Sequence, residues 1–118
     1  MTRARFAVTP LPGGGTRLRL TVAGHAGYAP PGQDILCAAA RILAASLAQV
    51  LQSRDGSGEI TACCRRGDGR MELTADCAPG QYPQVRAWFE PTLAGYRLLA
   101  QHYPRWVRFY PQKEAESC

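Results

Sequence analysis

Hydrophobic and polar residues alternate along the first part of the chain with the two-residue period of β-strands. Arg3–Thr9 alternates loosely, and Arg17–Ala23 places three apolar side chains on one face. These three are Leu18, Leu20 and Val22. The glycine-rich run Leu11–Gly15 supplies the flexible residues of a hairpin connection. The pattern therefore predicts two antiparallel strands, each buried on one face.

After a loop, the apolar residues recur at three- and four-residue steps, which is the spacing of an α-helix. Asp34 is a good N-cap, and the helix that it predicts begins at Ile35 and ends at about residue 52 or 53. The apolar positions at this spacing are Ile35, Ala39, Ile42, Leu43, Leu47, Val50 and Leu51. Because alanines are frequent between positions 38 and 48, the helix can pack closely against a sheet or a second subunit.

The second half of the chain repeats this order of elements. Two short strands, on either side of the turn Gly67–Gly69, and a second helix are predicted in the segments Glu59–Arg65, Arg70–Asp76 and Val85–Tyr103. Pro91 removes a hydrogen bond inside that helix, so we expect a kink or two short helices that meet near Glu90. Trp106–Tyr110 is a candidate for a short final edge strand.

The order β-β-α-β-β-α predicts a two-layer α+β domain. One antiparallel sheet of four to five strands would be covered on one face by the two helices. The chain has 118 residues, of which 46% are hydrophobic, enough for one core. We therefore expect a single domain over residues 1–111, followed by a frayed C-terminal tail over residues 112–118.

Composition and charge limit the location and the partners. No stretch approaches the roughly 18 uninterrupted apolar residues of a membrane-spanning helix, and residues 1–10 lack the apolar centre of a secretory signal. We expect a cytoplasmic protein without membrane contact. The net charge of +5 would suit RNA, but charge alone speaks only to non-specific binding, and a GC-rich genome also favours arginine. Direct RNA binding is therefore left open.

The five cysteines indicate reduced thiols, because their number is odd and the adjacent pair Cys63 and Cys64 would be strained as a disulfide. With no Cys-x-x-Cys pair and only His25 and His102 as imidazoles, the sequence predicts no metal site and no cofactor. We interpret Cys63, Cys64 and Cys77 as strand or strand-end packing.

Cys37 is the one cysteine at a position that favours an anion. It is the third residue of the first predicted helix, where backbone N–H groups and the helix dipole stabilise negative charge. His25 lies off the core if the strand period continues, and the loop after it must return to the helix start. The two side chains can therefore meet as a nucleophile and its general base. The alternative is a purely structural role for both residues, with Cys37 as a small buried thiol and His25 as a loop residue.

Asp34 admits two roles. As a helix cap it accepts the N–H of Cys37, and as a third catalytic residue it orients the imidazole of His25. If it is the cap, the N–H of Cys37 is not available to an oxyanion. The side-chain amide of Gln33 or loop N–H groups near Gly32 would then stabilise the tetrahedral intermediate.

Two segments, Gly24–Tyr28 (GHAGY) and Gly32–Ala39 (GQDILCAA), closely resemble the signature of the bacterial ribosomal-processing cysteine protease family. Gly95–Ala100 and Tyr103–Pro104 are similar to the second helix of that family and its exit. The resemblance implies a small α+β cysteine endopeptidase, commonly homodimeric. It also implies a substrate, the precursor of a large-subunit ribosomal protein, from which the enzyme removes a short N-terminal extension.

The resemblance also implies roles for single residues. The family's catalytic histidine, its nucleophile and the aspartate three residues before the nucleophile match His25, Cys37 and Asp34. A family preference for aromatic and apolar residues beside the cut would fit a cleft bordered by Tyr28, which could equally cover the helix start. Arg41 departs from the small residue found in many members, and Pro30–Pro31 stiffens a loop that the family closes over its substrate.

Two functions of other classes remain as alternatives. A non-catalytic ribosome- or RNA-associated module would use the arginines, and its RNA binding would weaken steeply with salt. A redox-sensing thiol protein would join Cys37 to another cysteine under oxidant.

Overall fold

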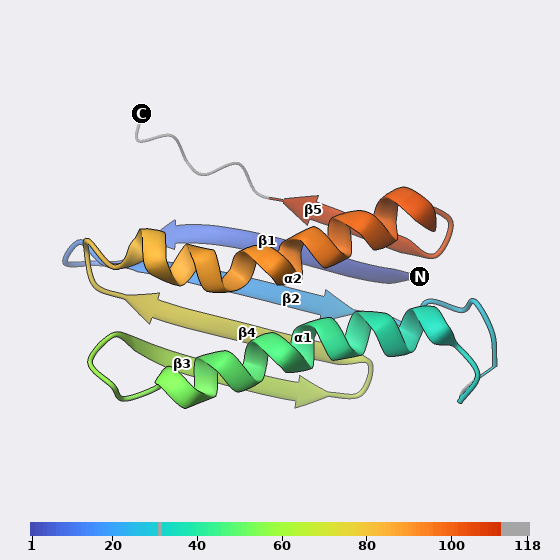
Figure 1. Cartoon of the computed structure of the whole chain (residues 1–118), viewed down its shortest axis with the longest axis horizontal. Helices are drawn as coiled ribbons and strands as arrows, with labels where there is room; N and C mark the ends of the chain where they lie inside the picture. Colours follow the sequence, from blue (N-terminus) through green and yellow to red (C-terminus); the bar gives the residue numbers. More distant parts are fainter. Residues whose placement is uncertain (31, 112–118) are drawn as a thin grey trace.

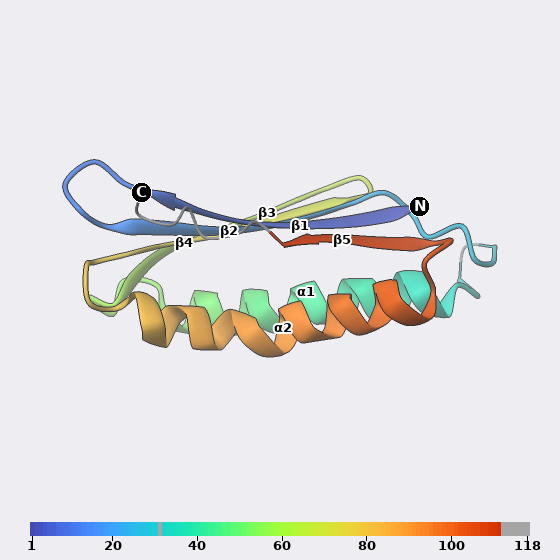
Figure 2. The same cartoon turned by 90° about the horizontal axis from the view of Figure 1, so that it is seen from above.

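Two helices lie side by side against one face of a five-stranded sheet (Figures 1 and 2) in the computed structural model, which describes residues 1–30 and 32–111. The elements in chain order are β1 (Thr2–Pro10), β2 (Thr16–Ala23), α1 (Ile35–Arg54), β3 (Ile60–Gly67), β4 (Arg70–Cys77), α2 (Tyr82–His102) and β5 (Val107–Pro111). The predicted two-layer α+β fold is confirmed. The tail predicted at 112–118 lies outside the described residues.

The strands lie in the order β3-β4-β2-β1-β5. Every neighbouring pair is antiparallel except β1 and β5, which are parallel, so the sheet is mixed. The final strand predicted at the edge is present. Helix α2 runs back along the whole sheet after β4, so β5 starts again from the end where β4 started and points in the same direction as β4. Because β4 and β1 are both antiparallel to β2, β5 is also parallel to β1. The sequence pattern of a strand is the same in either direction and does not reveal this.

The core lies between the sheet and the helices. As the alternation predicts, Leu18, Leu20 and Val22 of β2 are buried. Phe6 of β1 and Leu73 of β4 are buried on the same side of the sheet. The other side, which we call the open face, carries the alternate residues of each strand and has no helix over it in Figure 2.

Helix α1 begins at the predicted residue and ends one or two residues later than predicted. Leu47 and Leu51 are buried as the spacing predicts, but the other residues of the helix in the core are Leu36, Ala40, Ala44 and Ala48. The small side chains at 40, 44 and 48 let the helix lie close to its neighbours, and Ile35, Ile42 and Val50 point outward. The buried hydroxyl of Tyr96 in α2 donates to the carbonyl of Ala40. By length and composition alone α1 could cross a membrane, a test that the core helix of a soluble protein also passes.

The prediction of two short helices that meet at Pro91 is wrong. Helix α2 is a single helix from Tyr82 to His102 and contains Pro91. The proline and Ala87, whose carbonyl loses its hydrogen bond, are both exposed, so water can satisfy that carbonyl. The opposite side of the helix holds the element together, since Val85, Phe89 and Leu93 are packed in the core.

Candidate active site

The structure brings the predicted pair together. His25 follows the end of β2 after one glycine, and Cys37 is the third residue of α1. The Sγ atom of Cys37 lies 3.9 Å from Nδ1 of His25, within hydrogen-bond reach for sulfur. His25 is exposed and Cys37 is half-buried, so both are accessible to a substrate. The geometry is that of a nucleophile next to a base.

Asp34 is the N-cap of α1. Its Oδ1 accepts the N–H of Cys37 at 2.9 Å, and its Oδ2 accepts the N–H groups of Tyr28 and Ala29 at 3.0 and 3.4 Å. Burial acts to raise the pKa of the Asp34 carboxyl, but these N–H groups together hold it below its usual value. Among the described residues, no hydrogen bond joins Asp34 to His25. Asp34 thus fixes the helix start and the loop before it.

The imidazole of His25 rests against the turn between β3 and β4. A Cβ atom at Gly69 would lie 3.0 Å from Nε2 of His25, and Gly69 has a φ of 64°, a conformation that favours glycine. The N–H of Gly24 donates to the carbonyl of Gly69 at 2.8 Å, which fastens the turn to the end of β2. The sequence pattern predicts Gly67–Gly69 only as a turn. The structure makes it the support of the histidine.

The pair opens into a cavity of about 540 Å³. Its walls come from the N-terminal half of α1, the ends of β1 and β2, and the β3–β4 turn. The apolar part of its lining includes Val22, Ala40 and Met71. A mostly apolar cavity beside a nucleophile can hold an uncharged side chain of a peptide next to the bond to be cut.

Charged residues also line this cavity. Arg41 lies one turn after Cys37 on α1. Arg66 comes from the end of β3, Asp68 from the turn and Arg70 from the start of β4. Arg70 is paired with Glu72 at 3.5 Å, whereas Arg41 has no ion pair with any described residue. The sequence singles out Arg41 only as a departure from the family pattern. Its spacing of four from Cys37 on a predicted helix is the signal that the two share a face.

Three predicted loop residues do not line the cavity. The ring of Tyr28 packs edge-on against Trp106 and Tyr103, with centroid distances of 5.0 and 6.2 Å. The backbone N–H of Gln33 donates to the carbonyl of Pro30, so only its exposed side chain is left as a donor. Gly32 has a φ of 84° and lets the loop turn. Tyr28 therefore anchors the loop, and the oxyanion donors at Gly32 and Gln33 stay a prediction.

The other cysteines differ in exposure. Cys77 is buried and Cys64 half-buried, as expected for strand packing, and burial raises the pKa of both thiols. Cys63 is exposed on the open face, so the prediction of packing is wrong for it. It sits on the edge strand β3, which no further strand covers. Within residues 1–30 and 32–111, no three His, Cys, Asp or Glu side chains cluster to hold a metal ion.

One family model matches nearly the whole chain. It is described as cysteine protease Prp and matches residues 1–108. No curated protein matches the sequence.

Solved structures with the same fold include the ribosomal processing protease Prp of Staphylococcus aureus with a covalently linked product peptide. It is 15% identical, with a TM-score of 0.71 over 95% of this chain and 100% of that one. The same protein with a substrate peptide aligns with a TM-score of 0.65 at 14% identity, over 95% and 100% of the two chains. SMU.848 from Streptococcus mutans is 26% identical, with a TM-score of 0.64 over 95% and 94%.

Proposed function

Because the chain belongs to the cysteine protease Prp family, we propose that Cys37 is its nucleophile and His25 its general base and acid. The observation that carries the proposal is the 3.9 Å approach of Sγ to Nδ1 at the mouth of a cavity. Neither residue is in the core. The helix cap at Asp34 positions Cys37, and the turn at Gly69 lies against His25.

The reaction divides into two steps. The Cys37 thiolate attacks the carbonyl carbon of the peptide bond, and His25, which holds the proton, delivers it to the leaving amine as the bond breaks. This leaves an acyl-enzyme with a thioester at Cys37. His25 then takes a proton from water, whose oxygen attacks the thioester, and the peptide acid and the free thiol are released.

The negative oxygen of the tetrahedral intermediate requires hydrogen-bond donors, and two backbone N–H groups near the start of α1 are already engaged. The N–H of Cys37 is engaged by Asp34, and that of Gln33 by Pro30. We assign this role to the side-chain amide of Gln33 and to loop N–H groups near Gly32.

We propose that the substrate is the N-terminal extension of a large-subunit ribosomal protein precursor. Support comes from the S. aureus relatives, which are described as ribosomal processing proteases and hold a product or a substrate peptide. The alignment covers those chains completely, so each element of their fold has a counterpart in this chain.

The direct test is cleavage of a purified, extended ribosomal protein by the full chain, followed by mass spectrometry of the products. The wild type should release the extension, while Cys37→Ala and His25→Ala should not. Cys63→Ser is the matched control, because it removes the exposed thiol outside the site. Unchanged cleavage by Cys37→Ala would overturn the assignment of the nucleophile.

The rate of alkylation near neutral pH is an independent test of the reactivity of the Cys37 thiol. Among the described cysteines, Cys37 should react with iodoacetamide faster than the more exposed Cys63, because Nδ1 of His25 lies 3.9 Å from its Sγ and can accept the thiol proton. Equal rates at the two cysteines would contradict an activated Cys37.

We further propose that the enzyme acts in the cytoplasm, where ribosomal proteins are made, and that it forms a homodimer. The dimer is supported by the outward side chains of α1, since Ile35 and Ile42 are 61% and 63% exposed. Cell fractionation with an antibody against the chain tests the first proposal. Sedimentation velocity over a range of concentrations tests the second.

A further inference from the structure

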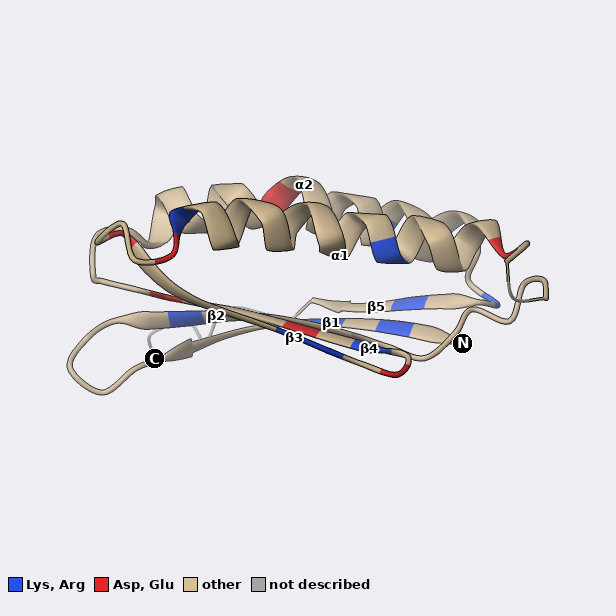
Figure 3. Ribbon diagram, turned by 90° about the horizontal axis from the view of Figure 1, so that it is seen from below, with Lys and Arg blue, Asp and Glu red and all other residues tan. Residues whose placement is uncertain are grey.

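The open face of the sheet concentrates positive charge. Its arginines alternate along the strands with buried residues, as Arg3 and Arg5 do with Ala4 and Phe6. They are Arg3, Arg5, Arg17, Arg19, Arg65, Arg70 and Arg108. The acidic residues at the same alternation are Glu72 and Asp76. Figure 3 shows the basic segments along the strands, while the helices carry few charges.

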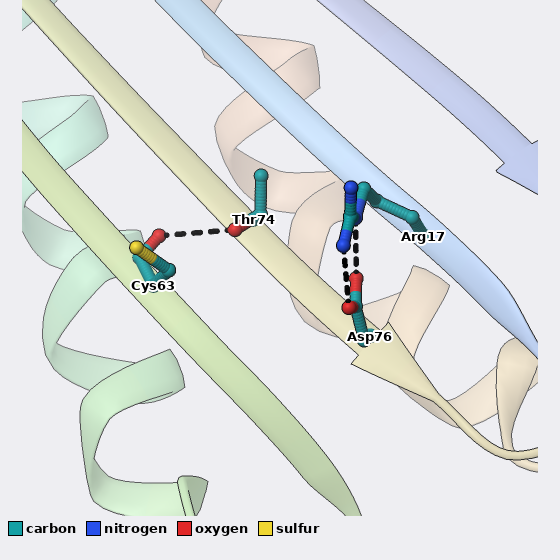
Figure 4. A network of polar contacts seen from close by, with 4 residues as sticks. All are labelled: Arg17, Cys63, Thr74 and Asp76. Carbon is teal, nitrogen blue, oxygen red and sulfur yellow. Dashed lines mark hydrogen bonds and ion pairs between the residues drawn. The ribbon is translucent and has the colours of Figure 1, made fainter. Parts of the chain in front are cut away.

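Two of these arginines are neutralised by neighbours. Arg17 makes a bidentate pair with Asp76, with N–O distances of 2.7 and 2.8 Å, on the side of the sheet away from the helices (Figure 4). The hydrogen bond to Asp76 and its charge raise the pKa of Arg17. Arg70 pairs with Glu72. The other arginines have no ion pair with a described residue, and they are Arg3, Arg5, Arg19, Arg65 and Arg108.

The unpaired arginines lie close to one another. Arg3 and Arg108 are direct partners in the β1–β5 register, and Arg5 is the next residue of β1 on the same face. Like charges directly opposite each other destabilise a sheet. A polyanion on this face would relieve that repulsion, because its phosphates would lie between the guanidinium groups.

An aromatic ring lies among these charges. Tyr110 of β5 is 40% exposed, and the guanidinium carbon of Arg5 lies 4.3 Å from the centre of its ring. An exposed ring flanked by arginines is a stacking surface for an unpaired base. Among the described residues, Tyr110 is the one large apolar side chain exposed on the open face, which leaves little to insert into a lipid bilayer.

We propose that the open face binds single-stranded RNA, with its phosphates on the unpaired arginines and a base on Tyr110. The choice of RNA over DNA rests on the proposed function, because the proposed substrate is a ribosomal protein and the ribosome contains RNA. The hydroxyl of Thr21, next to Arg5 in the β1–β2 register, can bond a ribose 2′-hydroxyl. The cavity with Cys37 lies between α1 and one end of the sheet, and none of the five unpaired arginines lines it, so RNA and the peptide would occupy different surfaces.

Fluorescence anisotropy of a labelled single-stranded RNA oligonucleotide, titrated with the full chain over a range of salt, tests the proposal. With roughly 0.7 counterions released per phosphate neutralised, five contacts give a slope of log K against log salt of about −3.5. A fourfold rise in salt should then weaken binding about a hundredfold. Arg3→Gln with Arg108→Gln should make the slope shallower by about 1.4.

The matched control is Arg97→Gln with Arg105→Gln, which removes the same charge from α2 and the turn after it. It should keep the wild-type slope. Arg3→Lys with Arg108→Lys should restore most of the slope, because lysine also neutralises phosphate. Tyr110→Ala should lower the affinity about fivefold or more without changing the slope.

Equal loss in both glutamine pairs would overturn the proposal, since total charge and not this face would then govern binding. Tighter binding to single-stranded DNA of the same sequence, or to phosphatidylserine vesicles, would also overturn it. The glutamine pair on β1 and β5 should still cleave a short extension peptide at the wild-type rate. RNA binding and peptide cleavage can therefore each fail without the other.

Discussion

The side chain of His25 is held by a backbone that is distant in sequence. The β3–β4 turn approaches the imidazole so closely at Gly69 that only a hydrogen fits there without a shift. The same turn is joined to Gly24 by a hydrogen bond. The distance between base and nucleophile therefore depends on two hairpins meeting at one end of the sheet, and not only on the loop between His25 and Cys37.

Gly69→Ala should lower kcat/KM about tenfold or more, because the added methyl would contact Nε2 and displace the imidazole from its position beside the thiol. A misplacement of about 1 Å can cost roughly a hundredfold in rate. Peptide cleavage under single-turnover conditions measures the effect on chemistry. Gly56→Ala is the control, since Gly56 has a similar φ of 75° and nothing within 4 Å of the added atom. Both variants should lose about 1–2 kcal/mol of stability, so an equal loss of activity in both would contradict steric displacement.

Arg41 should select among substrates. Its guanidinium lines the cavity one turn from Cys37 and has no ion pair with a described residue. Peptides with glutamate beside the cut should therefore be cleaved a few-fold faster than the same peptides with lysine, within the roughly 1 kcal/mol of an exposed ion pair. Arg41→Ser should reduce this difference, and Arg97→Ser should not. The ratio of kcat/KM values for the two peptides measures it, and a ratio unchanged in Arg41→Ser would rule the role out.

The residues that the sequence identifies share one property. Cys37, Asp34 and His25 are placed by local rules, namely the cap, the first helical turn and the strand period, which a single sequence displays. The structure places them as expected, although their catalytic role stays a prediction. Gly69 reaches the site through the packing of separate hairpins, and no local pattern reports that contact. Tyr28, expected at the cleft or the helix start, packs on Trp106, which lies far along the chain.

At the scale of elements, the start of α1 depends on Asp34. Asp34→Ala should lower the free energy of unfolding by about 1 kcal/mol, because the N–H groups of Cys37 and Tyr28 lose their acceptor. Asp34→Asn keeps a cap oxygen and should lose only a few tenths, and it should keep cleavage within about tenfold of wild type. A loss near 10⁴-fold in the asparagine variant is the signature of an orienting carboxylate and would contradict the cap as its main role.

The same carboxyl makes stability depend on pH. Because the pKa of Asp34 is lower in the folded protein than in the unfolded chain, its contribution is fully present above about pH 4 and is lost as the pH falls through the folded value. Urea unfolding at a series of acidic pH values should therefore show a steeper loss of stability for wild type than for Asp34→Asn. Parallel curves for the two proteins would contradict this prediction.

The elements themselves are predictable because each follows a period. Strands and helices lie within a few residues of their predicted bounds, since turns rich in glycine and proline separate them. The predictions that are wrong concern the environment of an element, that is, which of its faces is buried and which is exposed. Pro91 is tolerated because its face of α2 is exposed, and the outward position of Ile42 depends on which alanines meet the sheet and α2. Periodicity alone cannot decide between two apolar faces of one helix.

At the scale of the whole molecule, the two layers present different surfaces. The open face of the sheet is polar and basic, whereas the outer side of α1 exposes three large apolar side chains, Ile35, Ile42 and Val50. Exposed apolar side chains gathered on one helix favour burial against another surface. An identical helix from a second copy would supply such a surface. Ser46, four residues from both Ile42 and Val50, is small enough to permit close approach, and its hydroxyl donates to the carbonyl of Ile42.

Ser46→Glu should therefore convert the protein from a dimer to a monomer, because each dimer would bury two charges without partners. Ser46 is exposed and does not line the cavity, whereas Ile42 on the same face of α1 does. Sedimentation velocity over a range of concentrations gives the mass of each species. Gln101→Glu, at an exposed position of α2, is the control with the same added charge and should remain a dimer. A wild type that stays monomeric at the highest concentration would contradict the dimer, and a Ser46→Glu variant that stays dimeric would place the interface elsewhere than on α1.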